Sequence, residues 1–192
     1  MAEVLIILLL ILINGLLAGT EIAVLSVRRS LLSAQARAGD GRARQVLRLL
    51  DDPNAFLSTI QIGITLVGIL AGAVGGADAV RYLAPRLSRL PIPGIAGYAE
   101  PVALGLVVVT IAYLTLVVGE LVPKRLALYR PEGISRAMAR PMRYLAAVAR
   151  PAVWVLSRST DAALRALGIS GVHRPTVTEE EVRYLVAEGA HT

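Results

Sequence analysis

Three long apolar runs, separated by polar segments, divide the chain. They cover residues 4–26, 55–80 and 101–122, and charged positions inside them are few. An α-helix needs about 20 predominantly apolar residues to cross a bilayer, so each run is long enough to span one. The pattern therefore predicts an all-α integral membrane domain with three transmembrane helices.

Two of the predicted spans contain residues that interrupt helices. The second carries a series of glycines, at positions 63, 68, 72, 75 and 76. At the end of the third, Pro123 has no backbone N–H, so the carbonyl of Gly119, four residues earlier, loses its helical hydrogen-bond partner. In hydrocarbon such a carbonyl is tolerated only where another group satisfies it. We therefore expect the second and third spans to be bent or broken.

The first span carries polar and small residues on defined faces. Asn14, Ala18 and Glu21 share one face of the predicted helix. Gly15 and Gly19 lie on the adjacent face, and their four-residue spacing permits the close approach of another helix. We expect this face to be a packing surface.

The polar segments predict the orientation of the chain. Residues 28–53 carry an excess of arginine over aspartate, and residues 124–143 form a second basic cluster. Residues 77–100 are less basic and contain several prolines and glycines, so an outside loop with short helical pieces is expected there. Because basic segments stay in the cytoplasm, the N-terminus is predicted outside and the C-terminus in the cytoplasm of a cell (inner) membrane.

A shorter apolar stretch follows the third span. Residues 144–156 are interrupted by Arg150 and Pro151, and the stretch is too short to cross a bilayer. It predicts a juxtamembrane, cytosolic helix at the interface, with a fourth crossing as the alternative. Further on, Thr178-Glu-Glu-Glu is a capping-box signal for another helix.

These features predict three parts of the chain. Residues 1–140 form the transmembrane domain and residues 141–175 a juxtamembrane helical belt. Residues 176–192 begin a connector to a cytosolic domain that is missing from this sequence.

Composition supports a membrane protein. The chain is 55% hydrophobic and only 18% charged, values too apolar for an ordinary soluble domain. A net charge of +6 could indicate nucleic acid, but the chain has one Trp and one Phe to stack on bases, and its arginines flank apolar runs. The absence of cysteine excludes disulfides, thiolate metal sites and cysteine catalysis.

Acidic side chains inside the spans are the main candidates for chemistry. Glu120 lies beside the freed Gly119 carbonyl, and Glu21 follows Thr20 in the first span. Intramembrane carboxylates are costly and suggest an ion path, although Glu120 could instead face the headgroups. Oxygen ligands without histidine or cysteine suit Mg²⁺ or Ca²⁺, and also Na⁺, rather than zinc or copper.

Several residues allow two interpretations. One face of the second span carries small and polar residues, which serve helix packing alone or packing together with pore lining: Ser58, Gln61, Thr65, Gly68 and Gly72. Lys124 could pair with Glu120 four residues earlier, or anchor the helix at the headgroups, which we favour. No HExxH or GxSxG motif is present, so an enzyme is not expected, whereas a membrane scaffold or sensor stays open.

Three motifs together resemble a known family. They are Ala18-Gly-Thr-Glu-Ile-Ala followed by Ser26, then Pro53-Asn-Ala-Phe-Leu-Ser-Thr-Ile-Gln-Ile-Gly-Ile-Thr-Leu-Val-Gly, then Gly119-Glu-Leu-Val-Pro-Lys. In this order and spacing they resemble the transmembrane domain of the CNNM/CorC family of magnesium transporters. The segment Thr178-Glu-Glu-Glu-Val resembles the connector into a pair of CBS domains. Those domains bind ATP in the family and are absent here.

The resemblance implies a Mg²⁺ transporter, generally held to be a Na⁺-driven exporter. It also implies a homodimer formed through the transmembrane helices and a dehydrated Mg²⁺ held at mid-membrane by side-chain oxygens and main-chain carbonyls. Alternating access around one such site per subunit is the mechanism we expect. The candidate metal ligands are Gly119, Glu120, Ser26, Thr20, Glu21, Gln61, Gly63 and Thr65.

This chain departs from the family pattern at two positions. Ala18 stands where many relatives have serine, and Ile64 stands where some have asparagine. Compared with those relatives, a hydroxyl ligand at position 18 is therefore lost. Ser26, Thr20 and Thr65 are the candidates to compensate.

Overall fold

The fold is all-α, as predicted. The computed structural model describes residues 2–91 and 94–168, and no strand is found among them. The elements are α1 (Ala2–Ser26), α2 (Arg29–Arg37), α3 (Gly41–Asp51), α4 (Pro53–Leu87), α5 (Ile95–Leu116), the π-helical η1 (Val117–Leu121), α6 (Val122–Tyr129) and α7 (Pro131–Ala166). The helix predicted after Thr178 and the connector at 176–192 lie outside the described residues.

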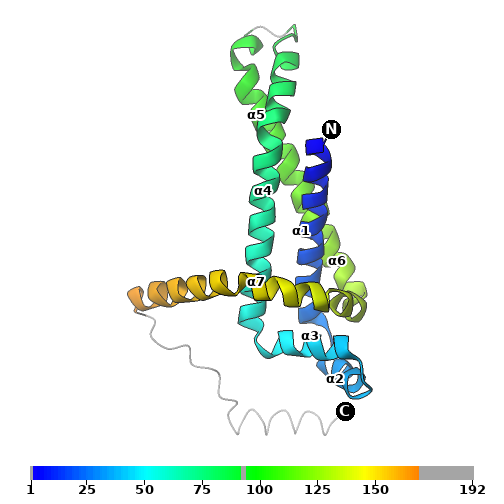
Figure 1. Cartoon of the computed structure of the whole chain (residues 1–192). Helices are drawn as coiled ribbons and strands as arrows, with labels where there is room; N and C mark the ends of the chain where they lie inside the picture. Colours follow the sequence, from blue (N-terminus) through cyan, green and yellow to red (C-terminus); the bar gives the residue numbers. More distant parts are fainter. Residues whose placement is uncertain (1, 92–93, 169–192) are drawn as a thin grey trace, which may run out of the picture. The chain divides into compact units, whose positions relative to one another are not determined.

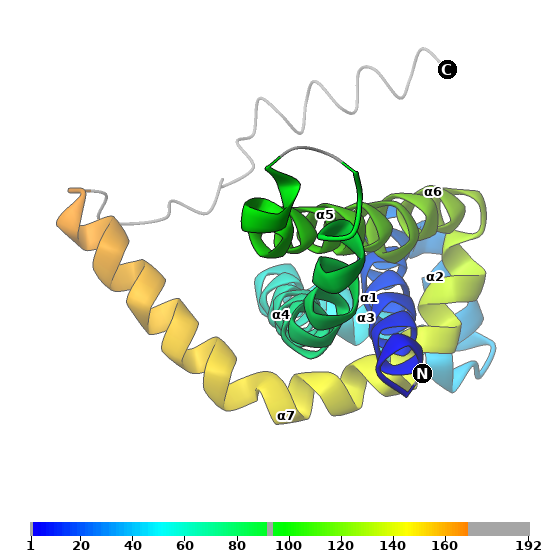
Figure 2. The ribbon, with the colours of Figure 1, turned by 90° about the horizontal axis from the view of Figure 1, so that it is seen from above.

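Three helical segments are long and apolar enough to cross a membrane. They are Glu3–Ser26, Pro53–Gly76 and Ile95–Tyr129, which confirms the predicted number of spans for the described part of the chain. α1, α4 and α5 lie side by side in Figure 1, and the end-on view of Figure 2 shows α6 continuing from α5 beside α1. The stretch 144–156 is not among the candidate spans, as expected.

Side chains along these spans favour lipid over water. Leu5, Leu9, Leu12 and Leu16 are exposed on α1, and Leu66 and Ile69 are exposed on α4, with a similar apolar row on α5. Water-soluble monomers rarely expose such continuous apolar surface, whereas in a bilayer it contacts acyl chains.

α4 is longer and more regular than predicted. It runs as one uninterrupted α-helix from Pro53 to Leu87, so the predicted break at its glycines does not occur. The prediction of short pieces over 77–100 is wrong for the first half of that segment. Without water to bond to backbone groups, a helix is retained even through glycines. Pro85 lies inside the last turn, and the helix continues past it to Leu87.

The third span is interrupted, as predicted. The α-helical pattern of α5 gives way to the π-helical η1, in which the N–H of Val122 donates to the carbonyl of Val117, and α6 then continues to Tyr129. A π-helical turn contains one more residue than an α-helical turn. The interruption immediately precedes Pro123, whose missing N–H cannot continue the α-helical pattern.

Short capped helices follow α1. The Gly-Asp-Gly break lies between α2 and α3, with Gly39 at a φ of 99° that favours glycine. The side chain of Asp40 then caps α3 by accepting from the N–H groups of Arg42 (2.8 Å) and Ala43 (3.3 Å). The prediction of one helix on each side of this break is confirmed.

α7 packs through one face. Ser135, Ala139, Met142 and Ala149 are buried at helical spacing. Ala139 and Met142 join the main buried core, which α1, α2, α3 and α4 also build. Figure 1 shows this part of α7 running crosswise to α1 and α4.

Two ion pairs link α7 to the segments that follow α1. They join Arg136 to Asp40 (3.1 Å) and Glu132 to Arg28 (3.6 Å). Residues up to Val153 form one compact unit, and the end of α7 from Trp154 to Ala166 belongs to a second. The predicted domain boundary at residue 140 falls inside α7, and the predicted division stays a prediction.

Candidate functional site

The interrupted end of the third span packs closely against α1. A Cβ atom added to Gly15 would lie 2.9 Å from Cγ of Pro123 and 3.2 Å from the carbonyl oxygen of Val118. One added to Gly19 would lie 3.3 Å from the carbonyl oxygen of Pro123. The close approach predicted from the Gly15–Gly19 spacing is therefore confirmed, and its partner is the segment around Pro123.

This approach places a side-chain amide beside the freed carbonyl. Nδ2 of Asn14 donates a hydrogen bond of 2.9 Å to the carbonyl oxygen of Gly119, and both residues are buried. The carbonyl therefore has the substitute partner that a position four residues before proline requires in a membrane. A carbonyl oxygen has two lone pairs, so it retains one further acceptor position.

Asn14 also brings an oxygen of its own. Its side chain is 2% exposed, and within the described part of the chain Oδ1 has no hydrogen-bond partner. A buried amide oxygen without a donor is unfavourable unless a donor or a cation is supplied. Sequence reasoning did not include Asn14 among the ligands, although its place on the face of Glu21 was the available signal.

Next to Gly119 in the sequence, Glu120 and a second carboxylate share one ammonium group. Nζ of Lys124 lies 2.7 Å from Oε1 of Glu120 and 3.4 Å from Oε2 of Glu21. The three side chains are partly buried, with exposures of 29%, 38% and 20% for Lys124, Glu120 and Glu21. The preference for a headgroup anchor at Lys124 is therefore wrong, because partly buried carboxylates in a span need a charge partner.

The charges of this triad do not balance. Two carboxylates and one ammonium leave an excess of negative charge, in a place built by α1, η1 and α6. Chemically, the arrangement suits a cation that either joins the ammonium or replaces it. In the described part of the chain, no group of three or more His, Cys, Asp or Glu residues could hold a metal ion.

The other predicted ligands differ in burial. Thr20 is buried on α1, and its hydroxyl donates to the carbonyl of Leu16 at 2.5 Å. Gly63 is buried, and an added Cβ would lie 2.9 Å from Cδ1 of Leu17. Three residues are exposed: Ser26, Gln61 and Thr65. Of the predicted ligands, Glu21, Gly119 and Glu120 thus lie at the contact between α1 and the end of the third span. A ligand role for the remaining predicted residues stays a prediction.

An apolar cavity of about 420 Å³ between α4 and α5 leads to Glu120. Three glycines of α4, at positions 68, 72 and 76, line it, and a Cβ added to any of them would meet nothing within 4 Å. Val107 and Ile111 line it from α5. The glycine face of the second span is therefore open in the single chain.

Comparison with known proteins identifies the family. The cyclin M transmembrane N-terminal domain (CNNM) family matches residues 5–192. This chain belongs to the CNNM family. The resemblance drawn from the three motifs is therefore confirmed. The Gly119–Lys124 motif, which contains Glu120 and Pro123, packs against α1 in this CNNM chain.

Bacterial relatives extend the comparison. UPF0053 protein sll0260 of Synechocystis is 46% identical over 188 residues, covering 98% of this chain and 42% of the relative. The polyamine export protein of Haemophilus influenzae is 30% identical over 181 residues, covering 94% of this chain and 41% of the relative. This CNNM chain thus spans about two fifths of the length of these relatives.

Proposed function

We propose that this chain is the membrane-spanning part of a cation exporter whose substrate is Mg²⁺. The observation that carries the proposal is the pair of carboxylates, Glu21 and Glu120, supplied by two spans and compensated by Lys124. Charged groups are costly in a membrane and by default belong to ion pathways. Membership of a family with a transport or export role supports the same function.

Oxygen atoms of the required kind lie around this place. Mg²⁺ prefers about six oxygen ligands in octahedral geometry. In the proposed site, Glu21 and Glu120 supply carboxylate oxygens, Gly119 its remaining carbonyl lone pair, and Asn14 its unpartnered Oδ1. The remaining candidates complete the shell in another conformation of the spans: Thr20, Ser26, Gln61, Gly63 and Thr65.

Lys124 acts in this proposal as a built-in counter-cation. While the site is empty, its ammonium compensates the two carboxylates. An entering divalent cation repels the ammonium at such short range and displaces it. After the divalent cation leaves, Lys124 returns and again compensates the two carboxylates, which lowers the free energy of the empty site. Na⁺ is the proposed coupling ion and enters from the opposite side of the membrane.

The proposed assembly is a homodimer formed through the transmembrane helices. The open glycine face of α4, at Gly68, Gly72 and Gly76, supports it, because small residues at this spacing let helices approach closely. In the proposed orientation the N-terminus is outside and the C-terminus cytoplasmic in the inner membrane. The basic segments after α1 and around α7 support this orientation.

Export of a polyamine is the second candidate function. An ammonium group already lies between the two carboxylates, which is how a polyamine end would bind. The apolar cavity that leads to Glu120 could take its methylene chain. A relative covering 94% of this chain is named a polyamine export protein.

A flux assay with purified protein in liposomes tests the proposal. Mg²⁺ and a polyamine such as spermidine are each loaded and their release followed, with Glu120→Ala as the test variant and Glu100→Ala, exposed near the start of α5, as the control. Loss of Mg²⁺ flux in the first variant alone supports the Mg²⁺ proposal. Spermidine flux without Mg²⁺ flux favours the second candidate. Saturable Mg²⁺ binding without flux of either favours a sensor, whereas neither binding nor flux favours a scaffold.

A further inference from the structure

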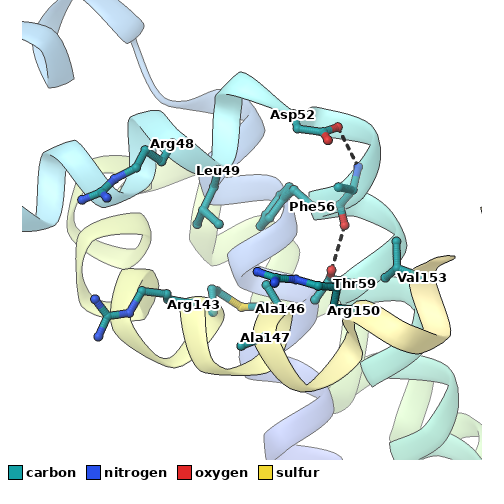
Figure 3. Close-up of a pocket in the computed structure, with 12 residues that line it drawn as sticks. Arg48, Leu49, Asp52, Phe56, Thr59, Arg143, Ala146, Ala147, Arg150 and Val153 are labelled. Carbon is teal, nitrogen blue, oxygen red and sulfur yellow. Dashed lines mark hydrogen bonds between the residues drawn. The ribbon is translucent and has the colours of Figure 1, made fainter.

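A second cavity is lined by residues other than those of the carboxylate pair. It has a volume of about 350 Å³ and is lined by α3, the start of α4 and α7 up to Val153 (Figure 3). Apolar side chains from all three helices form its floor, including Phe56 and Met142, which are 4% and 1% exposed. The cavity therefore offers an apolar surface beneath its polar rim.

The neutral and acidic polar groups of this cavity are used internally. Oδ1 of Asp52 accepts from the N–H of Ala55 at 3.0 Å and caps α4. The hydroxyl of Thr59 donates to the carbonyl of Ala55 at 2.8 Å. Both contacts are drawn in Figure 3. Oδ1 of Asp52 and the hydroxyl of Thr59 are therefore already engaged within the chain.

Three arginines supply the remaining polar groups. Arg48 comes from α3, and Arg143 and Arg150 come from α7 (Figure 3). Within the described residues none of them forms an ion pair, in contrast to Arg28, Arg29 and Arg136, which pair with carboxylates. Against the single carboxylate of Asp52, the cavity carries an excess of positive charge, which calls for an anion.

The position of the cavity along α4 decides the kind of anion. Asp52 immediately precedes the candidate span Pro53–Gly76, and Phe56 lies in its first turn. The rim is thus at the depth of lipid headgroups, while the apolar floor continues toward the acyl region. Basic pockets between helices at this depth bind anionic lipid headgroups, whereas a soluble anion would gain nothing from the apolar floor.

We propose that this cavity binds an anionic glycerophospholipid, with its phosphate between Arg48, Arg143 and Arg150 and an acyl chain along Phe56 and Met142. The lipid then ties α7 to α3 and α4. The proposal is independent of the cation site, because it rests on different residues.

Native mass spectrometry of the purified protein with phosphatidylglycerol or phosphatidylcholine tests this site. We expect preferential retention of phosphatidylglycerol, and about a fivefold loss of its affinity for Arg143→Gln or Arg150→Gln, from about 1 kcal/mol per basic residue. The matched control is Arg125→Gln, which removes an exposed arginine outside the cavity. Arg150→Lys should retain most of the preference.

Three outcomes would overturn the proposal. They are equal retention of the two lipids, equal loss in the Arg125 variant, and soluble glycerol phosphate competing as well as the lipid. Melting curves show whether each variant is folded. If a glutamine variant is unfolded, the folded Arg150→Lys variant is used instead, and loss of its preference for phosphatidylglycerol would support a packing role for Arg150. Cation flux in the same preparations is read separately, so failure of the lipid site leaves the export proposal unaffected.

Discussion

The side-chain amide of Asn14 donates to the carbonyl of Gly119, at 2.9 Å and across 105 positions of sequence. The bond replaces the one that Pro123 cannot make. It joins the first span to the interrupted end of the third and brings the freed carbonyl into a buried site. The proposed cation site therefore depends on a hydrogen bond between spans.

Removing this bond should destabilise the fold. We expect Asn14→Ala to lower the free energy of unfolding by about 1–3 kcal/mol, because it leaves a buried carbonyl unsatisfied. Unfolding in mixed detergent micelles measures the loss, and Asn54→Ala, at an exposed position, is the control.

A double variant tests the reason for the bond. Pro123→Ala restores an N–H that can donate to the carbonyl of Gly119. In the Pro123→Ala protein, Asn14→Ala should therefore lower the free energy of unfolding by less than it does in the unmodified chain. Equal costs in both backgrounds would show that the proline does not create the need for Asn14.

Lys124→Met should strengthen cation binding. The variant leaves Glu21 and Glu120 without their ammonium, so an added cation no longer competes with it. Calorimetry at low ionic strength should show Mg²⁺ affinity higher by about tenfold, which corresponds to about 1.4 kcal/mol. Arg125→Met is the control. Weaker binding in the Lys124 variant would instead make the lysine a support of the site.

Two glycine substitutions should have opposite effects. Gly15→Ala places a Cβ 2.9 Å from Pro123 and should destabilise the fold by about 1–3 kcal/mol. Gly72→Ala meets nothing within 4 Å and should be neutral or stabilise α4 by up to about 1 kcal/mol. Melting temperatures of the monomeric protein in detergent compare them. Destabilisation by both would contradict the packing described here.

The cap of α3 predicts a pH dependence. The N–H of Arg42, followed by that of Ala43 and the charge of Arg136, holds the pKa of Asp40 below its ordinary value. Because the folded pKa is the lower one, the carboxylate stabilises the fold above the unfolded pKa of about 3.9. That stability is lost as the pH falls through the folded pKa.

Asp40→Asn should therefore melt at a lower temperature than the unmodified chain near pH 7. The difference should shrink as the pH falls below about 4. Melting curves across that range measure it, with the exposed Asp161→Asn as control. A difference independent of pH would rule out the charge of Asp40 as its cause.

The sequence predicted the features that follow from local chemistry. Apolar runs of sufficient length gave three spans, and a proline four residues after Gly119 gave the interruption in the third. Features that depend on packing were not predictable. The continuation of α4 to Leu87 depends on its surroundings, since its glycines and Pro85 argue locally against it. Glu21, the second partner of Lys124, and Asn14, the partner of Gly119, lie on α1, and no local pattern shows which residues meet across two spans.

The π-helical segment Val117–Leu121 sets the rotation of α6 about its own axis. One extra residue in a turn offsets the following helix by about 100° relative to an uninterrupted α-helix. Lys124 reaches Glu21 with that offset in place. Relaxing the wide turn would rotate α6 by one residue position and carry the ammonium away from α1. The conformation of this one turn therefore determines whether the ammonium of Lys124 lies beside Glu21.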